Sequence, residues 1–97
     1  MASATLLFES KRVFADGLIA ETRIWVVPDR VPGSKHRLKY SLFYGGAGGR
    51  MVGYDNEAGK GDHRHYGDRE EPYTFTTVER LVMDFLTDVS ALRGGDL

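Results

Sequence analysis

The feature that most constrains the fold is one stretch of helical periodicity that follows a chain of extended, turn-punctuated segments. Its apolar residues recur at helical spacing and form one stripe, namely Val78, Leu81, Val82, Phe85, Val89 and Leu92. Thr76 with Glu79 three residues later predicts a capping box at the start of this helix. Arg93 and Gly94 at the other end favour a left-handed C-terminal cap. We expect the stripe to pack on one face of a sheet.

Four segments before the helix are predicted to be β-strands, at about residues 5–14, 18–27, 36–44 and 50–55. Asp16-Gly17 favours a two-residue hairpin turn between the first two. In the second segment the purer apolar set should face the core, namely Leu18, Ala20, Thr22, Ile24 and Val26. In the third, one face should carry Leu38, Tyr40, Leu42 and Tyr44. The expected fold class is α+β, a four-stranded antiparallel sheet with a C-terminal helix packed on one face.

Composition narrows the classes of function. The length predicts a single domain over residues 1–97. Thirteen Lys and Arg against 14 Asp and Glu give a net charge of −1, so any nucleic-acid binding must use a local cluster of cations. No cysteine is present, which excludes disulfides and thiolate metal sites. The first residues lack the features of a signal peptide, and the apolar runs are too short to span a membrane. The expected location is the cytoplasm, with no membrane partner.

The segment from Tyr54 to Tyr66 is predicted to be a polar loop that presents functional side chains. It contains two of the three histidines, two cations and three carboxylates, namely His63, His65, Lys60, Arg64, Asp55, Glu57 and Asp62. Gly59 and Gly61 allow positive φ angles on either side of Lys60. The concentration of titratable groups makes this loop the candidate site.

The chemistry that these residues suit is metal-independent cleavage of RNA. One histidine takes the proton of the 2′-hydroxyl and the other protonates the leaving 5′-oxygen, and the order in sequence does not decide which does which. If residues 63–65 are extended, the two imidazoles share a face roughly 6.5–7 Å apart. Lys60 and Arg64 would stabilise the transition state, and Asp62 would orient one imidazole. Catalytic residues are therefore predicted to be His63, His65, Lys60, Arg64 and Asp62.

Substrate binding is assigned to Tyr54, Arg37 and Lys39. The last two share a polar strand face with Arg23, which becomes a phosphate-binding patch if the loop folds over it. No cofactor and no metal are predicted, although His63 and His65 with Asp62 or Asp55 form an alternative divalent-metal set.

Several other features have simpler structural explanations. The loop itself is also compatible with a solvated turn that makes surface ion pairs. His36 is interpreted as a strand-edge residue without a catalytic role, and residues 69–72 as a solvated turn before the helix. Trp25, Tyr40 and Phe43 are expected to pack in the core or on a sheet face.

Motifs across residues 36–90 carry a family resemblance. The segments are 36–42 (HRLKYSL), 52–56 (VGYDN), 59–65 (GKGDHRH), 71–75 (EPYTF) and 78–89, which includes Glu79-Arg80-Leu81 and Asp84-Phe85. Together they resemble the TumE family of bacterial toxins, of which the GKGDHRH run is the most specific part. No motif could be matched in the first hairpin, residues 5–27.

The resemblance implies the toxin of a type II toxin–antitoxin module, paired with a small DNA-binding antitoxin of helix-turn-helix type. Toxins of this kind commonly slow growth by cutting RNA, so the implied substrate is RNA. The rival hypothesis is a non-enzymatic protein that captures a partner through the polar loop. A metal-dependent nuclease is the third hypothesis.

Overall fold

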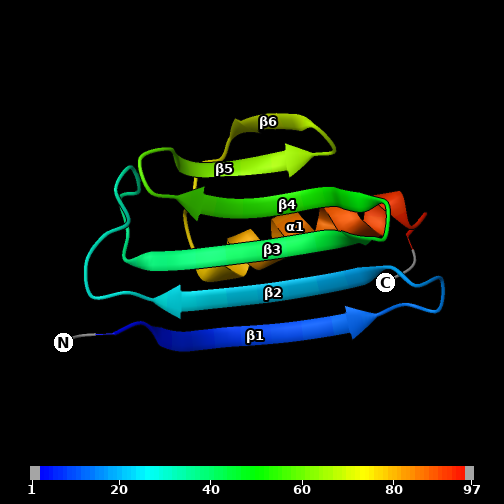
Figure 1. Ribbon diagram of the computed structural model, residues 1–97, viewed down its shortest axis with the longest axis horizontal. Coiled ribbons are helices and arrows are strands. Elements are labelled where there is room, and N and C mark those ends of the chain that lie inside the picture. Colours follow the sequence, from blue (N-terminus) through cyan, green and yellow to red (C-terminus); the bar gives the residue numbers. More distant parts are fainter. Residues whose placement is uncertain (1–2, 96–97) are drawn as a thin grey trace.

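The computed structural model describes residues 3–95, which form one antiparallel sheet covered on one face by a helix (Figure 1). The elements are β1 (Thr5–Val13), β2 (Ile19–Val26), β3 (Leu38–Gly46), β4 (Gly49–Glu57), β5 (Gly61–Tyr66), β6 (Arg69–Pro72) and α1 (Val78–Leu92). Each strand pairs with the next in chain order. The predicted α+β class with a C-terminal helix on one face is confirmed, but the predicted number of strands is wrong, because the sheet has six.

The two missed strands lie where a polar loop and a solvated turn were predicted. β4 continues to Glu57, and the chain then reverses through Gly59 and Gly61, whose φ angles of 86° and 77° suit only glycine. β5 and β6 follow, and both lack the apolar alternation that identifies a strand in sequence. Pro72 is tolerated because β6 is an edge strand.

The core lies between the sheet and α1, which packs mainly over β4. The predicted inward faces of β2 and β3 are confirmed over most of their length, since Ala20, Thr22, Ile24, Tyr40, Leu42 and Tyr44 are all buried. Val26, at the end of β2, is more exposed than predicted. From the helix the buried residues are Leu81, Phe85 and Val89. The opposite face of the sheet is not covered by the helix (Figure 1), and we call it the open face.

The cap at the start of α1 is shifted by one residue from the prediction. Thr77, not Thr76, is the N-cap, and its hydroxyl accepts a hydrogen bond from the backbone N–H of Arg80 at 3.1 Å. The third helical residue is thus Arg80, so the predicted box with Glu79 does not form. At the other end Gly94 has a φ of 66°, as the left-handed cap requires.

Asp62 ties the connection between β2 and β3 to the start of β5. Its carboxylate accepts hydrogen bonds from Ser34 Oγ at 2.5 Å, His36 Nε2 at 2.6 Å and the Tyr40 hydroxyl at 2.8 Å. The backbone N–H of Leu38 donates to His36 Nδ1 at 3.2 Å, so the proton of a neutral ring lies on Nε2. Burial alone would raise the pKa of Asp62, but these three donors hold it below its ordinary value.

The cap assignment predicts that Thr77→Ala lowers the free energy of unfolding by about 1 kcal/mol. The reason is the loss of the acceptor for the Arg80 N–H. Thr76→Ala is the matched control and should change stability by less than about 0.5 kcal/mol. Urea unfolding followed by circular dichroism measures both, and an equal loss in the two variants contradicts the assignment.

Asp62→Asn should lower the free energy of unfolding at pH 7 by about 1–3 kcal/mol, because the three donors lose an ionised acceptor. The folded-state pKa of Asp62 lies below its unfolded value of about 3.9, so its contribution is present above that pH and is lost as the pH falls further. Urea unfolding at several pH values should therefore show the gap between parent and variant closing below about pH 4. A gap that stays constant down to pH 2 argues against this role.

Candidate active site

Side-chain alternation along β5 divides the predicted catalytic residues between the two faces of the sheet. Arg64 lies directly across from the buried Tyr54, on the helix-covered face, and Asp62 points to the same side. His63 and His65 point to the open face, where His63 lies across from Asp55 of β4. Residues 63–65 are extended within β5, so the condition under which both imidazoles share one face is met, although this segment was predicted to be a loop.

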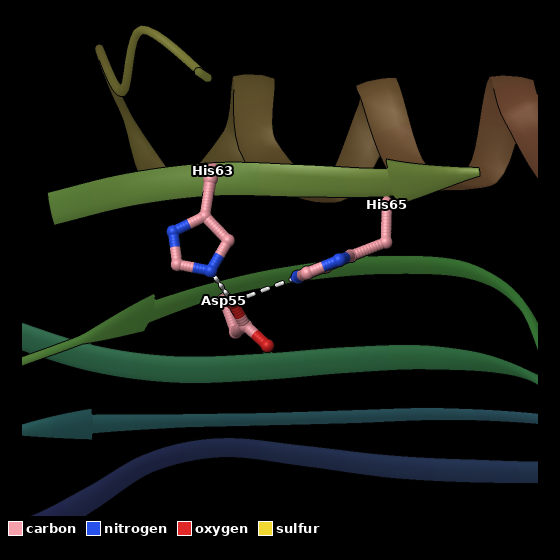
Figure 2. Close-up of side chains that lie close together, drawn as sticks. All are labelled: Asp55, His63 and His65. Carbon is pink, nitrogen blue, oxygen red and sulfur yellow. Dashed lines mark hydrogen bonds and ion pairs between the residues drawn. The ribbon is translucent and has the colours of Figure 1, made fainter. Parts of the chain in front are cut away.

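The two imidazoles share one carboxylate oxygen (Figure 2). His63 Nε2 lies 2.8 Å from Asp55 Oδ1, and His65 Nε2 lies 3.4 Å from the same atom. The ring centroids are 4.9 Å apart at an interplanar angle of 76°, closer than the spacing expected along a strand because both rings lean toward Asp55. Only 4% of His63 and 8% of His65 is exposed, so the rings are held in place.

Both ring nitrogens of His63 lie close to an oxygen of the protein. Its Nδ1 lies 3.0 Å from the carbonyl oxygen of Gly61, which can only accept, so Nδ1 carries a proton. Its Nε2 lies 2.8 Å from Asp55 Oδ1. These two contacts fix the orientation of the His63 ring.

His65 is differently placed, because one of its nitrogens makes no hydrogen bond to any residue that the structure describes. Nε2 faces Asp55, whereas Nδ1 lies 4.0 Å from the nearest oxygen of Glu70, beyond hydrogen-bonding distance. Glu70 is a surface residue of β6 that also lies 3.6 Å from His63 Nε2. It borders the pair on the side away from Asp55.

Two hollows adjoin the cluster of Asp55, His63 and His65, one lined in part by Asp55 and the other in part by His63. One, of about 330 Å³, is lined by Glu21, Arg23, Trp25, Lys39, Tyr40, Ser41, Asp55 and Glu57. The other, of about 240 Å³, is lined by Lys60, Asp62, His63, Glu70, Glu71 and Pro72. Arg50 also approaches, with Nη1 at 3.9 Å from Asp55 Oδ2. Cationic side chains therefore lie near the cluster, namely Arg23 and Lys39 in the first hollow, Lys60 in the second and Arg50 beside Asp55.

The remaining predicted site residues lie elsewhere. Arg64 binds Glu71 at 2.6 Å on the helix side, and although burial opposes it, this ion pair raises the pKa of the guanidinium. Asp62 orients His36 rather than either histidine of the pair. Arg37 precedes β3 and donates to the carbonyl of Pro28 at 3.3 Å.

Tyr54 is fully buried under the helix and donates a hydrogen bond to Asp88. Burial and this bond raise the pKa of its hydroxyl. Of the three predicted substrate-binding residues, Lys39 lines the 330 Å³ hollow, which Asp55 also lines.

Sequence reasoning missed the shared partner Asp55, which it considered only as one of two alternative metal ligands, and the bordering Glu70. The spacing of residues around the Gly59 turn already indicated that Asp55 and His63 are paired. With the turn centred on Gly59, residues 55 and 63 are four positions on either side, so an antiparallel register places them opposite one another. Recognising the strand would also have separated Asp62 and Arg64 from the histidines.

Asp55, His63 and His65 also have the composition of a metal site. One ligand atom from each lies within 4.8 Å of the other two, which is a set of two imidazoles and a carboxylate. Three protein ligands with a free coordination position are typical of catalytic zinc.

Among residues 3–95 no helix is long and apolar enough to cross a membrane.

The family model for the toxin TumE matches residues 3–93. The match confirms the resemblance seen in residues 36–90 and extends it through the first hairpin, where no motif had been matched. A search of curated proteins and a search of solved structures each returned no match. The chain therefore belongs to the TumE toxin family, and this membership carries a toxin role and implies an antitoxin as partner.

Proposed function

We propose that this toxin is a metal-independent endoribonuclease whose acid–base pair is His63 and His65. The observation that carries the proposal is the sharing of one carboxylate oxygen by two imidazoles whose centroids are 4.9 Å apart. Histidine serves as either acid or base near neutral pH, and RNA cleavage needs one of each. We further propose that the protein acts in the cytoplasm as part of a type II module with a helix-turn-helix antitoxin.

The reaction needs two proton transfers around one phosphorus atom. A base removes the proton of the 2′-hydroxyl while the 2′-oxygen attacks phosphorus. The bond from phosphorus to the 5′-oxygen breaks, and an acid protonates that oxygen. The products are a 2′,3′-cyclic phosphate and a free 5′-hydroxyl, so atoms and charges balance without a co-reactant.

The contacts favour His65 as the base and His63 as the acid. His65 Nδ1 makes no hydrogen bond within the described residues, so its lone pair is available to a 2′-hydroxyl. Asp55 lies 2.8 Å from His63 Nε2, which places a carboxylate beside the imidazolium form that an acid must adopt. Asp55 is the positioning residue, because its Oδ1 orients both rings.

The side chain of Glu70 affects how RNA can reach the two imidazoles. Its carboxylate lies 3.6 Å from His63 and 4.0 Å from His65, where it would repel a phosphodiester. The side chain is 43% exposed and belongs to a four-residue edge strand, so it is free to swing into solvent. Lys60, which shares the 240 Å³ hollow with His63, is the cation best placed to replace it against the phosphate.

A metal-dependent nuclease is the second candidate, favoured by the clustering of three ligand atoms within 4.8 Å. In that case Asp55, His63 and His65 would hold a divalent ion that activates a water molecule. Both mechanisms lose activity when a histidine is removed. They differ in their response to a chelator.

We expect His63→Ala and His65→Ala each to lower the rate of RNA cleavage by about 10²–10⁴-fold, because each removes one proton-transfer group. Asp55→Asn should also lower the rate of cleavage, since the Asp55 carboxylate positions both imidazoles. His36→Gln is the matched control, because this third histidine lies in the separate Asp62 cluster. The assay uses purified protein, labelled RNA and initial rates, with circular dichroism to confirm folding.

The same assay with EDTA separates the candidates. Cleavage that resists EDTA and is lost in both histidine variants supports the paired-histidine mechanism. Cleavage abolished by EDTA and restored by a divalent ion supports the metal mechanism instead. The parent protein could also arrest growth and yet cut no RNA, with or without metal. That result contradicts both nuclease mechanisms and favours partner capture.

A further inference from the structure

Trp25 lies in an unusual place for the chain's one tryptophan. It is on β2, directly across from Lys39 of β3, and its side chain faces the open side of the sheet, opposite to the buried Ile24. The residue is partly exposed and lines the 330 Å³ hollow. An exposed indole on an uncovered sheet face is the kind of platform on which single-stranded nucleic acids stack their bases.

The charges in this hollow indicate which part of a nucleotide it suits. Its two cations are already engaged, since Arg23 pairs with Glu9 at 3.3 Å and Glu21 at 3.6 Å, and Lys39 donates to the backbone carbonyl of Asn56. Three carboxylates, those of Glu21, Asp55 and Glu57, also line the hollow. Each has an ion-pair partner as well, but a carboxylate has about four acceptor positions and can accept a further hydrogen bond. Such a lining disfavours a phosphate and favours a ring that presents N–H donors.

We infer that this hollow is a nucleobase subsite in which a base of the RNA substrate stacks on Trp25. The inference rests on the proposed function and names a binding element for it. The acceptor-rich lining selects bases with an exocyclic amino group, because a carboxylate pairs well with the amino group of cytosine. Uracil presents a carbonyl oxygen at the same position and is disfavoured.

The position of the subsite relative to the histidines supports this role. Asp55 lines the hollow with one side and bonds both imidazoles through Oδ1. A base stacked on Trp25 therefore belongs to a nucleotide close to the bond that is cut. Trp25, Asp55 and His63 come from three strands of one rigid sheet, which fixes their separation.

The experiment uses the His63→Ala/His65→Ala protein, so that RNA stays intact during the measurement. Because the chain contains one tryptophan, its intrinsic fluorescence reports on Trp25 alone. Titrations with hexacytidylate and hexauridylate RNA form the matched pair, since cytosine and uracil differ mainly in the amino or carbonyl group that the carboxylates meet. We expect saturable quenching by both, with about tenfold tighter binding of hexacytidylate.

Variants test the stacking directly, with binding measured by the anisotropy of fluorescein-labelled hexacytidylate. Trp25→Ala should weaken binding by about 10–100-fold, whereas Trp25→Phe should recover most of it because the ring face is kept. Met83→Ala removes an exposed apolar side chain on the helix and should have no effect. Circular dichroism checks that each variant is folded.

The outcomes separate this inference from the proposed catalysis. Absence of quenching, or equal binding by parent and Trp25→Ala, overturns the subsite. Equal affinity for the two oligonucleotides overturns the role of the carboxylates. If Trp25 binds RNA with the expected preference but the parent cuts none, the subsite stands and the nuclease proposal fails.

Discussion

The organisation of this protein depends on the period-two alternation of side chains along β5. Successive residues of a strand point to opposite faces, and here each face has a different environment. Asp62 and Arg64 are directed under the helix, where the first joins Ser34, His36 and Tyr40 and the second joins Glu71. His63 and His65 are directed to the open face. One short strand therefore supplies both a structural cluster and the candidate active site.

Asp55 has the corresponding position on β4. Its carboxylate contacts both imidazoles, has Arg50 near its second oxygen and borders the hollow beneath Trp25. The buried Tyr54 and Asn56, its neighbours in sequence, point into the core and hold β4 in register. Packing of Tyr54 and Asn56 in the core thus determines where the Asp55 carboxylate lies on the open face of β4.

Sequence reasoning succeeded where apolar residues carry the pattern and failed where polar residues form regular structure. The stripe of α1 and the inward faces of β2 and β3 were predictable because burial requires them. β5 and β6 were not, because histidines, arginines and glutamates give no apolar alternation. The shared face of His63 and His65 could be predicted from spacing alone. Their partner could not, because the pairing with Asp55 depends on the register of a hairpin that had been interpreted as a loop.

The meander topology has a consequence for how the protein acquires its structure. Every strand pairs with its neighbour in the chain, so the sheet can grow by successive hairpins with little loss of chain entropy. The helix that buries the inner face of β4 follows all six strands in chain order. During synthesis the hairpin of β4 and β5, which carries Asp55, His63 and His65, therefore emerges before the helix that packs over β4. The inner face of β4 can therefore be buried by α1 only after all six strands have been synthesised.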